Sequence, residues 1–218
     1  MTRRRYAAGI ALLVVMLLGI AILSLGVGAV GLAPRTVIAV LLNRFDVALA
    51  SSDRAIVWDL RVPRIMLGIL IGGGLAVSGA AFQGLFRNPL ADPFVVGASG
   101  GAALGATLAI VLGATWSGAG LGPVSLAAFV GALGAVALVY GIAQVGGSAP
   151  VIALVLAGSA LSTLLSAIVS LLMLISDQGL HATYAWLLGG LSGRSWSQLA
   201  ASWPYLLVGS AALWLFSR

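Results

Sequence analysis

The sequence of 218 residues has no cysteine, no lysine and no glutamate, and charged residues make up only 7% of it. Without cysteine there is no disulfide framework and no thiolate metal site. Without lysine there can be no phosphate-binding loop of the Gly-x-x-x-x-Gly-Lys type. Without glutamate the His-Glu-x-x-His pattern of metalloproteases is excluded as well.

Apolar residues take the place of the missing charges. Hydrophobic residues account for 61% of the chain, and there are 30 glycines. An ordinary soluble domain carries about 25% charged residues, so this chain lacks the polar groups to cover a globule, and its solvent must be lipid. The net charge of +6 rests on scattered arginines. A nucleic-acid-binding surface needs many cations on one face, which this chain does not have.

Apolar windows of about 20 residues predict an all-α, polytopic membrane protein with about six transmembrane helices. The first apolar run is longer than the core of a signal peptide, so we expect an uncleaved helix. A short additional helix that dips into the membrane is expected at residues 183–191. The six expected spans are residues 7–32, 65–86, 98–114, 123–143, 151–175 and 199–216.

The arginines do not settle the orientation by number, because five would lie inside and six outside with the amino terminus in the cytoplasm. We nevertheless expect the amino terminus inside, because Arg3, Arg4 and Arg5 precede the first span with no acid nearby. Residues 34–64 then form an arginine-rich outer loop. Its guanidinium groups would either pair with aspartates of the loop or bind carboxylates of another protein.

Residues 59–101 hold the densest motifs. Pro63 is expected to end the outer loop and to place Arg61 and Arg64 at the head of the second span. The glycine-rich stretch 72–79 is expected to be crowded on several sides.

Three further features lie in or near this segment. Gln83 should face protein or water, because an unsatisfied amide is costly in lipid. Asn88-Pro89 and Asp92-Pro93 predict a tight, irregular link before the third span. Small residues at four-residue spacing predict close helix packing; they are Gly97, Gly101 and Gly105, and Gly158, Ser162, Ser166 and Ser170.

In order and spacing, these motifs resemble the permease subunits of ABC importers for iron-siderophore complexes, haem and cobalamin, the FecCD type. The resemblance runs from about residue 10 to the end of the chain, and it does not indicate which chelate is carried. The matching pattern is Arg-x-Pro-Arg at 61–64, Ser78-Gly79 in a glycine-rich helix, Gln83, Asn-Pro-Leu-Ala-x-Pro at 88–93, Gly-x-Ser-x-Gly at 97–101, and the segments 154–158 and 186–191.

The resemblance implies a single permease domain over residues 1–218, which is incomplete because family members have about ten spans of membrane length. It implies that Arg61 and Arg64 dock a periplasmic or lipoprotein substrate-binding protein. A structural and pathway motif would contain Gln83, Asn88, Pro89, Gly97, Ser99 and Gly101.

The same resemblance implies a second permease copy, identical or not, and cytoplasmic ABC ATPase subunits that hydrolyse the ATP. The expected location is the bacterial inner membrane. No cofactor, metal site or catalytic residue is expected in this chain. We interpret its length as that of a fragment, a split subunit or a truncated product that would not transport alone.

Other functions stay open. An ion-coupled secondary transporter would need ionisable groups within its spans, and none is expected there, although sodium could be held by carbonyl groups. A serine hydrolase would have only His181 as its base, and we expect that residue in a loop or at the interface. A truncated permease without function, or a scaffold, is a further alternative.

Overall fold

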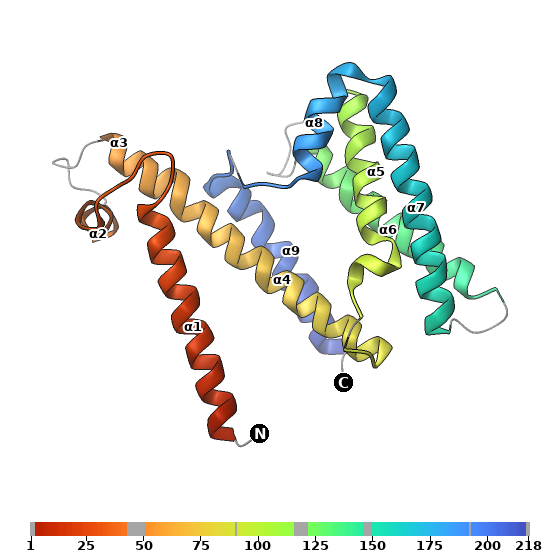
Figure 1. Cartoon of the computed structure of the whole chain (residues 1–218), viewed down its shortest axis with the longest axis horizontal. Coiled ribbons are helices and arrows are strands. Elements are labelled where there is room, and N and C mark those ends of the chain that lie inside the picture. The colour runs from red at the N-terminus through yellow and green to blue at the C-terminus, as the bar shows by residue number, and fades with distance from the viewer. Residues whose placement is uncertain are drawn as a thin grey trace. The chain divides into compact units, whose positions relative to one another are not determined.

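The computed structural model describes residues 3–42, 51–89, 91–115, 122–145, 150–191 and 193–216, and every regular element in these ranges is a helix. This confirms the all-α prediction. The helices, labelled in Figure 1 where there is room, are α1 (Arg3–Gly26), α2 (Pro34–Leu42), α3 (Ser51–Arg54), η1 (Ala55–Arg61), α4 (Val62–Phe86), η2 (Pro93–Val96), α5 (Ala98–Val111), α6 (Pro123–Ala143), α7 (Val151–Ile175), α8 (Asp177–Leu187) and α9 (Trp196–Phe216).

The chain divides into two compact units. The first contains residues 1–70 and 191–199, and the second contains residues 71–190 and 200–218. The single permease domain expected from the sequence stays a prediction.

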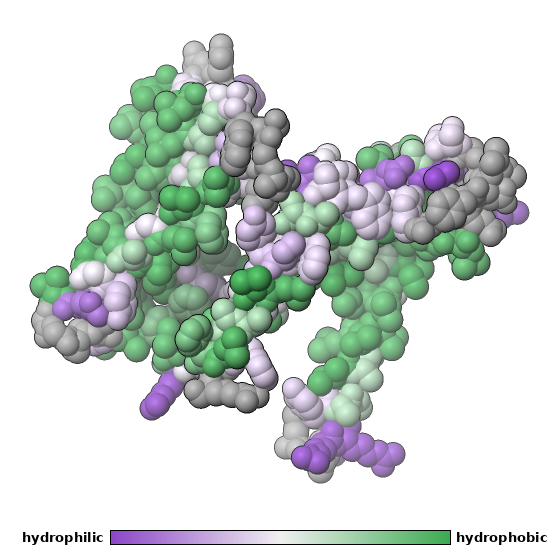
Figure 2. Space-filling view, turned by 180° about the vertical axis from the view of Figure 1, so that it is seen from behind, coloured by the Kyte–Doolittle hydropathy of each residue, from purple (hydrophilic) through white to green (hydrophobic). Residues whose placement is uncertain are grey.

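Five of the described helices are long and apolar enough to cross a membrane: α1, the continuous helix Ser51–Phe86, α6, α7 and α9. Apolar side chains cover the long helices, and hydrophilic residues gather at helix ends (Figure 2). The expected third span, α5, has only 14 residues, about 21 Å at 1.5 Å per residue, against a hydrocarbon core of about 30 Å. The chain is therefore a multi-pass membrane protein whose third apolar segment is a short helix.

The first span is shorter than predicted, and part of the expected outer loop is helical. Helix α1 ends at Gly26 rather than at residue 32, and α2 begins at Pro34, a residue well suited to the first turn of a helix. Val37 and Val40 lie three residues apart and bury one face of α2. They form an apolar cluster with Leu25 and Val57. Residues 43–50 of the expected loop lie outside the described part of the chain.

The prediction that Pro63 ends the loop is wrong, because the helix already begins at Ser51 and passes through the proline. Proline lacks an N–H and clashes with the carbonyl four residues before it. The chain accommodates it with the π-helical segment η1, whose wider turn lets the Val62 N–H donate to the Val57 carbonyl, five residues back. Pro63 is itself fully buried.

The wider turn leaves the Trp58 carbonyl opposite Pro63, which has no N–H to donate. The indole Nε1–H of Trp196 donates to this carbonyl oxygen at 3.0 Å. The two indole rings also pack together, with centroids 5.2 Å apart and planes inclined by 36°. Trp196, at the start of α9, thus satisfies a backbone acceptor that the proline cannot.

In the second unit, α5, α6 and α7 pack against one another, and α8 packs against α5 and α7 (Figure 1). Helix α8 confirms a short extra helix after the long α7, although it runs over 177–187 rather than 183–191. The Ser176 hydroxyl caps it by accepting from the Gly179 N–H at 3.2 Å.

Replacing Trp196 with phenylalanine should keep ring packing but lose the hydrogen bond to the Trp58 carbonyl. We expect the free energy of unfolding in detergent to fall by about 0.5–1.5 kcal/mol, the net contribution of one hydrogen bond. Thermal unfolding followed by circular dichroism measures it. Trp203→Phe, at an exposed position of the same helix, is the matched control. Equal effects of the two substitutions would contradict the assigned role.

Candidate functional sites

Arg61 lies in the first unit, and its side chain is buried, with 8% of its surface exposed. Its Nη1–H donates to the Leu25 carbonyl oxygen at 2.5 Å, and its Nη2–H donates to the Val30 carbonyl oxygen. Leu25 belongs to the last turn of α1, where carbonyls have no helical partner and the helix dipole favours a cation. The guanidinium therefore joins the end of α1 to the loop that follows it.

Arg64 lies one helical turn beyond Arg61 and is half-buried. Its Nε is buried without a hydrogen-bond partner. The two arginines of the Arg-x-Pro-Arg motif thus differ: Arg61 is bound to backbone carbonyls, and Arg64 makes no such bond to any residue that the structure describes. The docking role that the sequence predicts for the pair stays a prediction.

In the second unit, Gln83 and Asn88 take part in the end of α4. The Arg87 N–H donates to the Gly84 carbonyl at 3.3 Å, and the Asn88 N–H donates to the Gln83 carbonyl at 3.1 Å. This pair of bonds is a Schellman motif, which requires a left-handed residue after the helix. Arg87 occupies that position, with φ of 48°.

Pro89 follows directly and is exposed, as is the Gln83 side chain. Asp92 then accepts from the Phe94 N–H at 2.8 Å and caps η2, whose first residue is Pro93. These contacts confirm the tight, irregular link that Asn88-Pro89 and Asp92-Pro93 predict.

Gly97 joins η2 to α5 with φ of +88°, in the left-handed region that favours glycine. Gly97 is buried, and Ser99, two residues further, is exposed. The turn at Gly97 directs the small residues of α5 toward α6 and α7. The pattern Gly-x-Ser-x-Gly thus combines a backbone requirement at its start with a packing requirement at its end.

Gly101 lies where α5 crosses α6 at close range. A methyl group at Gly101 would overlap the carbonyl oxygen of Gly131, and one at Gly105 would overlap that of Ala127. On the other side of α5, a methyl group at Gly100 would lie 3.3 Å from the Cα of Ser162 in α7. The close packing predicted from the small residues is confirmed here, and their absence of side chains permits it.

Gly131, the partner of Gly101, is not among the small residues for which the sequence predicts close packing. The signal was present, because Ala127, Gly131 and Ala135 repeat every four residues in α6. By contrast, the residues that the structure describes do not crowd the glycines at 72–79 on several sides. Among them, Gly72, Gly73 and Gly79 would meet no neighbour within 4 Å, whereas Gly74 would meet Leu206.

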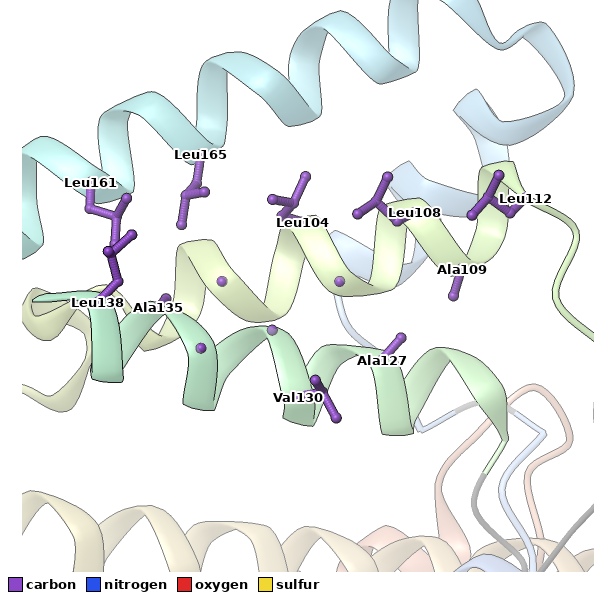
Figure 3. Close-up of a pocket in the computed structure, with 14 residues that line it drawn as sticks. Leu104, Leu108, Ala109, Leu112, Ala127, Val130, Ala135, Leu138, Leu161 and Leu165 are labelled. Atoms are coloured by element: carbon purple, nitrogen blue, oxygen red, sulfur yellow. The ribbon is translucent and has the colours of Figure 1, made fainter.

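A groove of about 460 Å³ follows the packing of α5, α6 and α7. In Figure 3, Leu161 and Leu165 extend from α7 toward α5 and α6, and Leu104, Leu108 and Leu112 follow α5. None of the lining residues has a polar or charged side chain. A wall of this kind can bury apolar surface, but it offers a solute no side-chain hydrogen bond.

Chemistry of other kinds finds little support among the described residues. No group of three or more His, Cys, Asp or Glu in this part of the chain could hold a metal ion. His181 is exposed on helix α8; of its two expected placements, a loop or the interface, the loop is wrong.

The fold defines an all-helical, multi-pass membrane protein whose second unit contains closely packed helices. The FecCD transport family matches residues 13–218, and the chain belongs to this family. The chain is 45% identical over 165 residues to the cobalamin import system permease protein BtuC of Halobacterium salinarum, covering 76% of this chain and 44% of that protein. It is 39% identical over 199 residues to the ferric enterobactin transport system permease protein FepD of Escherichia coli, covering 90% and 57%.

A solved structure, described as an inward-facing conformation of a metal-chelate type ABC transporter, matches with a TM-score of 0.74 at 30% identity. The match covers 96% of this chain and 61% of that one. The chain therefore spans about half the length of the relatives it resembles.

The close crossing of α5 and α6 predicts that Gly101→Ala destabilises the second unit. The added methyl group would force the helices apart, and overpacking of this kind costs about 1–3 kcal/mol. Gly134→Ala is the control, because a methyl group at this position of α6 would meet no described residue within 4 Å. The melting temperature in detergent should fall only for Gly101→Ala. An unchanged melting temperature of Gly101→Ala would contradict the close crossing.

Proposed function

We propose that the chain is a transmembrane permease subunit of a binding-protein-dependent ABC importer. The observation that carries this proposal is the match of residues 13–218 to the FecCD transport family, whose relatives include permeases for cobalamin and ferric enterobactin. The glycine-mediated packing of α5 on α6 supports it, because the motif residues Gly97 and Gly101 serve this packing.

The proposed substrate is a metal chelate or a corrinoid, carried across the bacterial inner membrane. Matched relatives are named for cobalamin, ferric enterobactin, iron citrate and molybdate. The apolar groove along α5–α7 lacks directional binding groups. Selection of the individual chelate is accordingly assigned to the external substrate-binding protein rather than to this chain.

An ion-coupled secondary transporter is less well supported. Such a protein needs ionisable groups that carry the coupling ion inside its spans. Helices α5, α6, α7 and α9 contain no Asp, Arg or His. With no lysine in the sequence, a Walker-type phosphate loop is also excluded, so ATP hydrolysis is assigned to separate cytoplasmic ATPase subunits.

The proposed assembly also contains a second permease copy and an external binding protein, with the amino terminus of this chain in the cytoplasm. Arg64 is proposed as a direct docking contact for carboxylates of the binding protein. An exposed ion pair contributes about 0–1 kcal/mol, so it influences encounter rate and orientation more than affinity.

The first functional test is substrate uptake into cells that express this chain with its ATPase and binding protein. Uptake of radiolabelled cobalamin or ferric siderophore should require the ATPase and should be abolished when the ATPase is inactivated by mutation. Uptake that continues without ATPase activity and collapses with the ion gradient would instead support the secondary transporter.

The second test reverses the charge of Arg64. We expect Arg64→Glu to slow association with the binding protein about tenfold at low salt, with the difference shrinking toward 1 M salt as charges are screened. Surface plasmon resonance with the chain in nanodiscs measures both rates. Arg87→Glu makes the same change in net charge on the side assigned to the cytoplasm and should have no effect. Equal rates for wild type and Arg64→Glu would remove Arg64 from the interface.

A further inference from the structure

We propose that Arg61 is a positioning residue that clamps the connection between α1 and α2, rather than a direct contact of the binding protein. The clamp formed by Arg61 can be tested on this chain alone. The effect of the clamp on docking rests on the proposed function, in which Arg64 contacts the binding protein.

The first step is the commitment of the Arg61 guanidinium. Its Nη1 and Nη2 donate to the carbonyls of Leu25 and Val30, five residues apart and on either side of the end of α1. With 8% of its surface exposed, the side chain could reach another protein only by breaking both bonds. Hydrogen bonds to a charged group are among the stronger ones in proteins, and a buried charge without partners is costly.

The second step is the shape of the loop that receives the guanidinium. A methyl group at Gly28 would lie 2.9 Å from Nη2 and 3.2 Å from Cζ of Arg61. The Leu32 N–H donates to the Gly26 carbonyl at 3.0 Å and closes the loop around this point. The loop thus fits the planar group against backbone, and glycine at position 28 provides the space.

The third step connects the clamp to Arg64. Arg61 precedes Arg64 by one helical turn, and the apolar cluster of Leu25, Val37, Val40 and Val57 packs against Val62 and Ile65 of the same helix. The clamp and this cluster hold the end of α1, helix α2 and the head of α4 as one body. Arg64 is presented from that body.

The chain offers a charge-neutral way to release the clamp. Gly28→Ala should displace the guanidinium while leaving every charge in place, and Arg61→Gln removes the guanidinium itself. Gly31→Ala is the control, because it lies in the same loop and no atom of the described part of the chain lies within 4 Å of the added methyl group. Hydrogen exchange followed by mass spectrometry on the full chain in nanodiscs reports on residues 27–33.

We expect exchange in residues 27–33 to accelerate about tenfold or more in Arg61→Gln and in Gly28→Ala, as loss of a charged hydrogen bond predicts. Gly31→Ala should behave as wild type. If Gly28→Ala exchanges as wild type does, the clamp is refuted, and this milder variant decides even if Arg61→Gln does not fold.

Binding-protein association then separates positioning from contact. Arg61→Gln and Gly28→Ala should both slow association, and the association rate should depend on salt as it does for wild type. Arg64→Gln should instead make the association rate less dependent on salt. A flattened salt dependence in Arg61→Gln, together with normal association in Gly28→Ala, would overturn the proposal in favour of direct contact. If wild type binds no such protein, the proposed function fails, and hydrogen exchange still decides whether the clamp exists.

Discussion

The structure depends on one constraint: where a helix in an apolar chain is interrupted, the chain itself must satisfy the backbone groups that the interruption leaves unpaired. Backbone groups at a helix end or opposite a proline have no partner within the helix, and leaving such a group buried and unpaired is costly. At three such interruptions, another group of the chain forms a hydrogen bond with the unpaired backbone carbonyl. The Arg61 guanidinium binds carbonyls at the end of α1, the Trp196 indole binds the carbonyl opposite Pro63, and a Schellman motif closes α4.

How well the sequence predicts each part depends on how far apart in the sequence its contacting residues lie. The apolar spans, the link at 88–93 and the small-residue face of α5 depend on local composition and spacing, and the sequence predicts them. The carbonyl that Pro63 cannot pair with belongs to Trp58, and its partner is an indole 138 residues further along the chain. Likewise, the burial of Arg61 depends on carbonyls 31 and 36 residues away. No local pattern reports such partners, and a proline or an arginine in isolation indicates a helix end or a solvated charge.

Glycines of similar appearance in the sequence have different surroundings in the structure. Gly101 and Gly105 approach the backbone of α6, where any side chain would collide. Gly72 and Gly73 in α4 meet no described neighbour. Small residues at four-residue spacing indicate that one face of a helix lacks bulky side chains. Whether two helices pack closely depends on a second face of this kind on the neighbouring helix. Helix α6 provides that face to α5 with Ala127, Gly131 and Ala135.

The two arginines of the Arg-x-Pro-Arg motif illustrate how one short pattern can combine two kinds of work. Pro63 lies between them, two residues after the end of the wide-turned segment η1, whose last residue is Arg61. Arg61 then reaches backbone carbonyls, while Arg64, one residue after the proline, lies past the π-helical segment. Because the helix continues unbroken through the motif, a displacement at Arg61 is transmitted to Arg64 within a single turn. The motif is therefore better understood as a structural unit that presents one arginine than as a pair of equivalent charges.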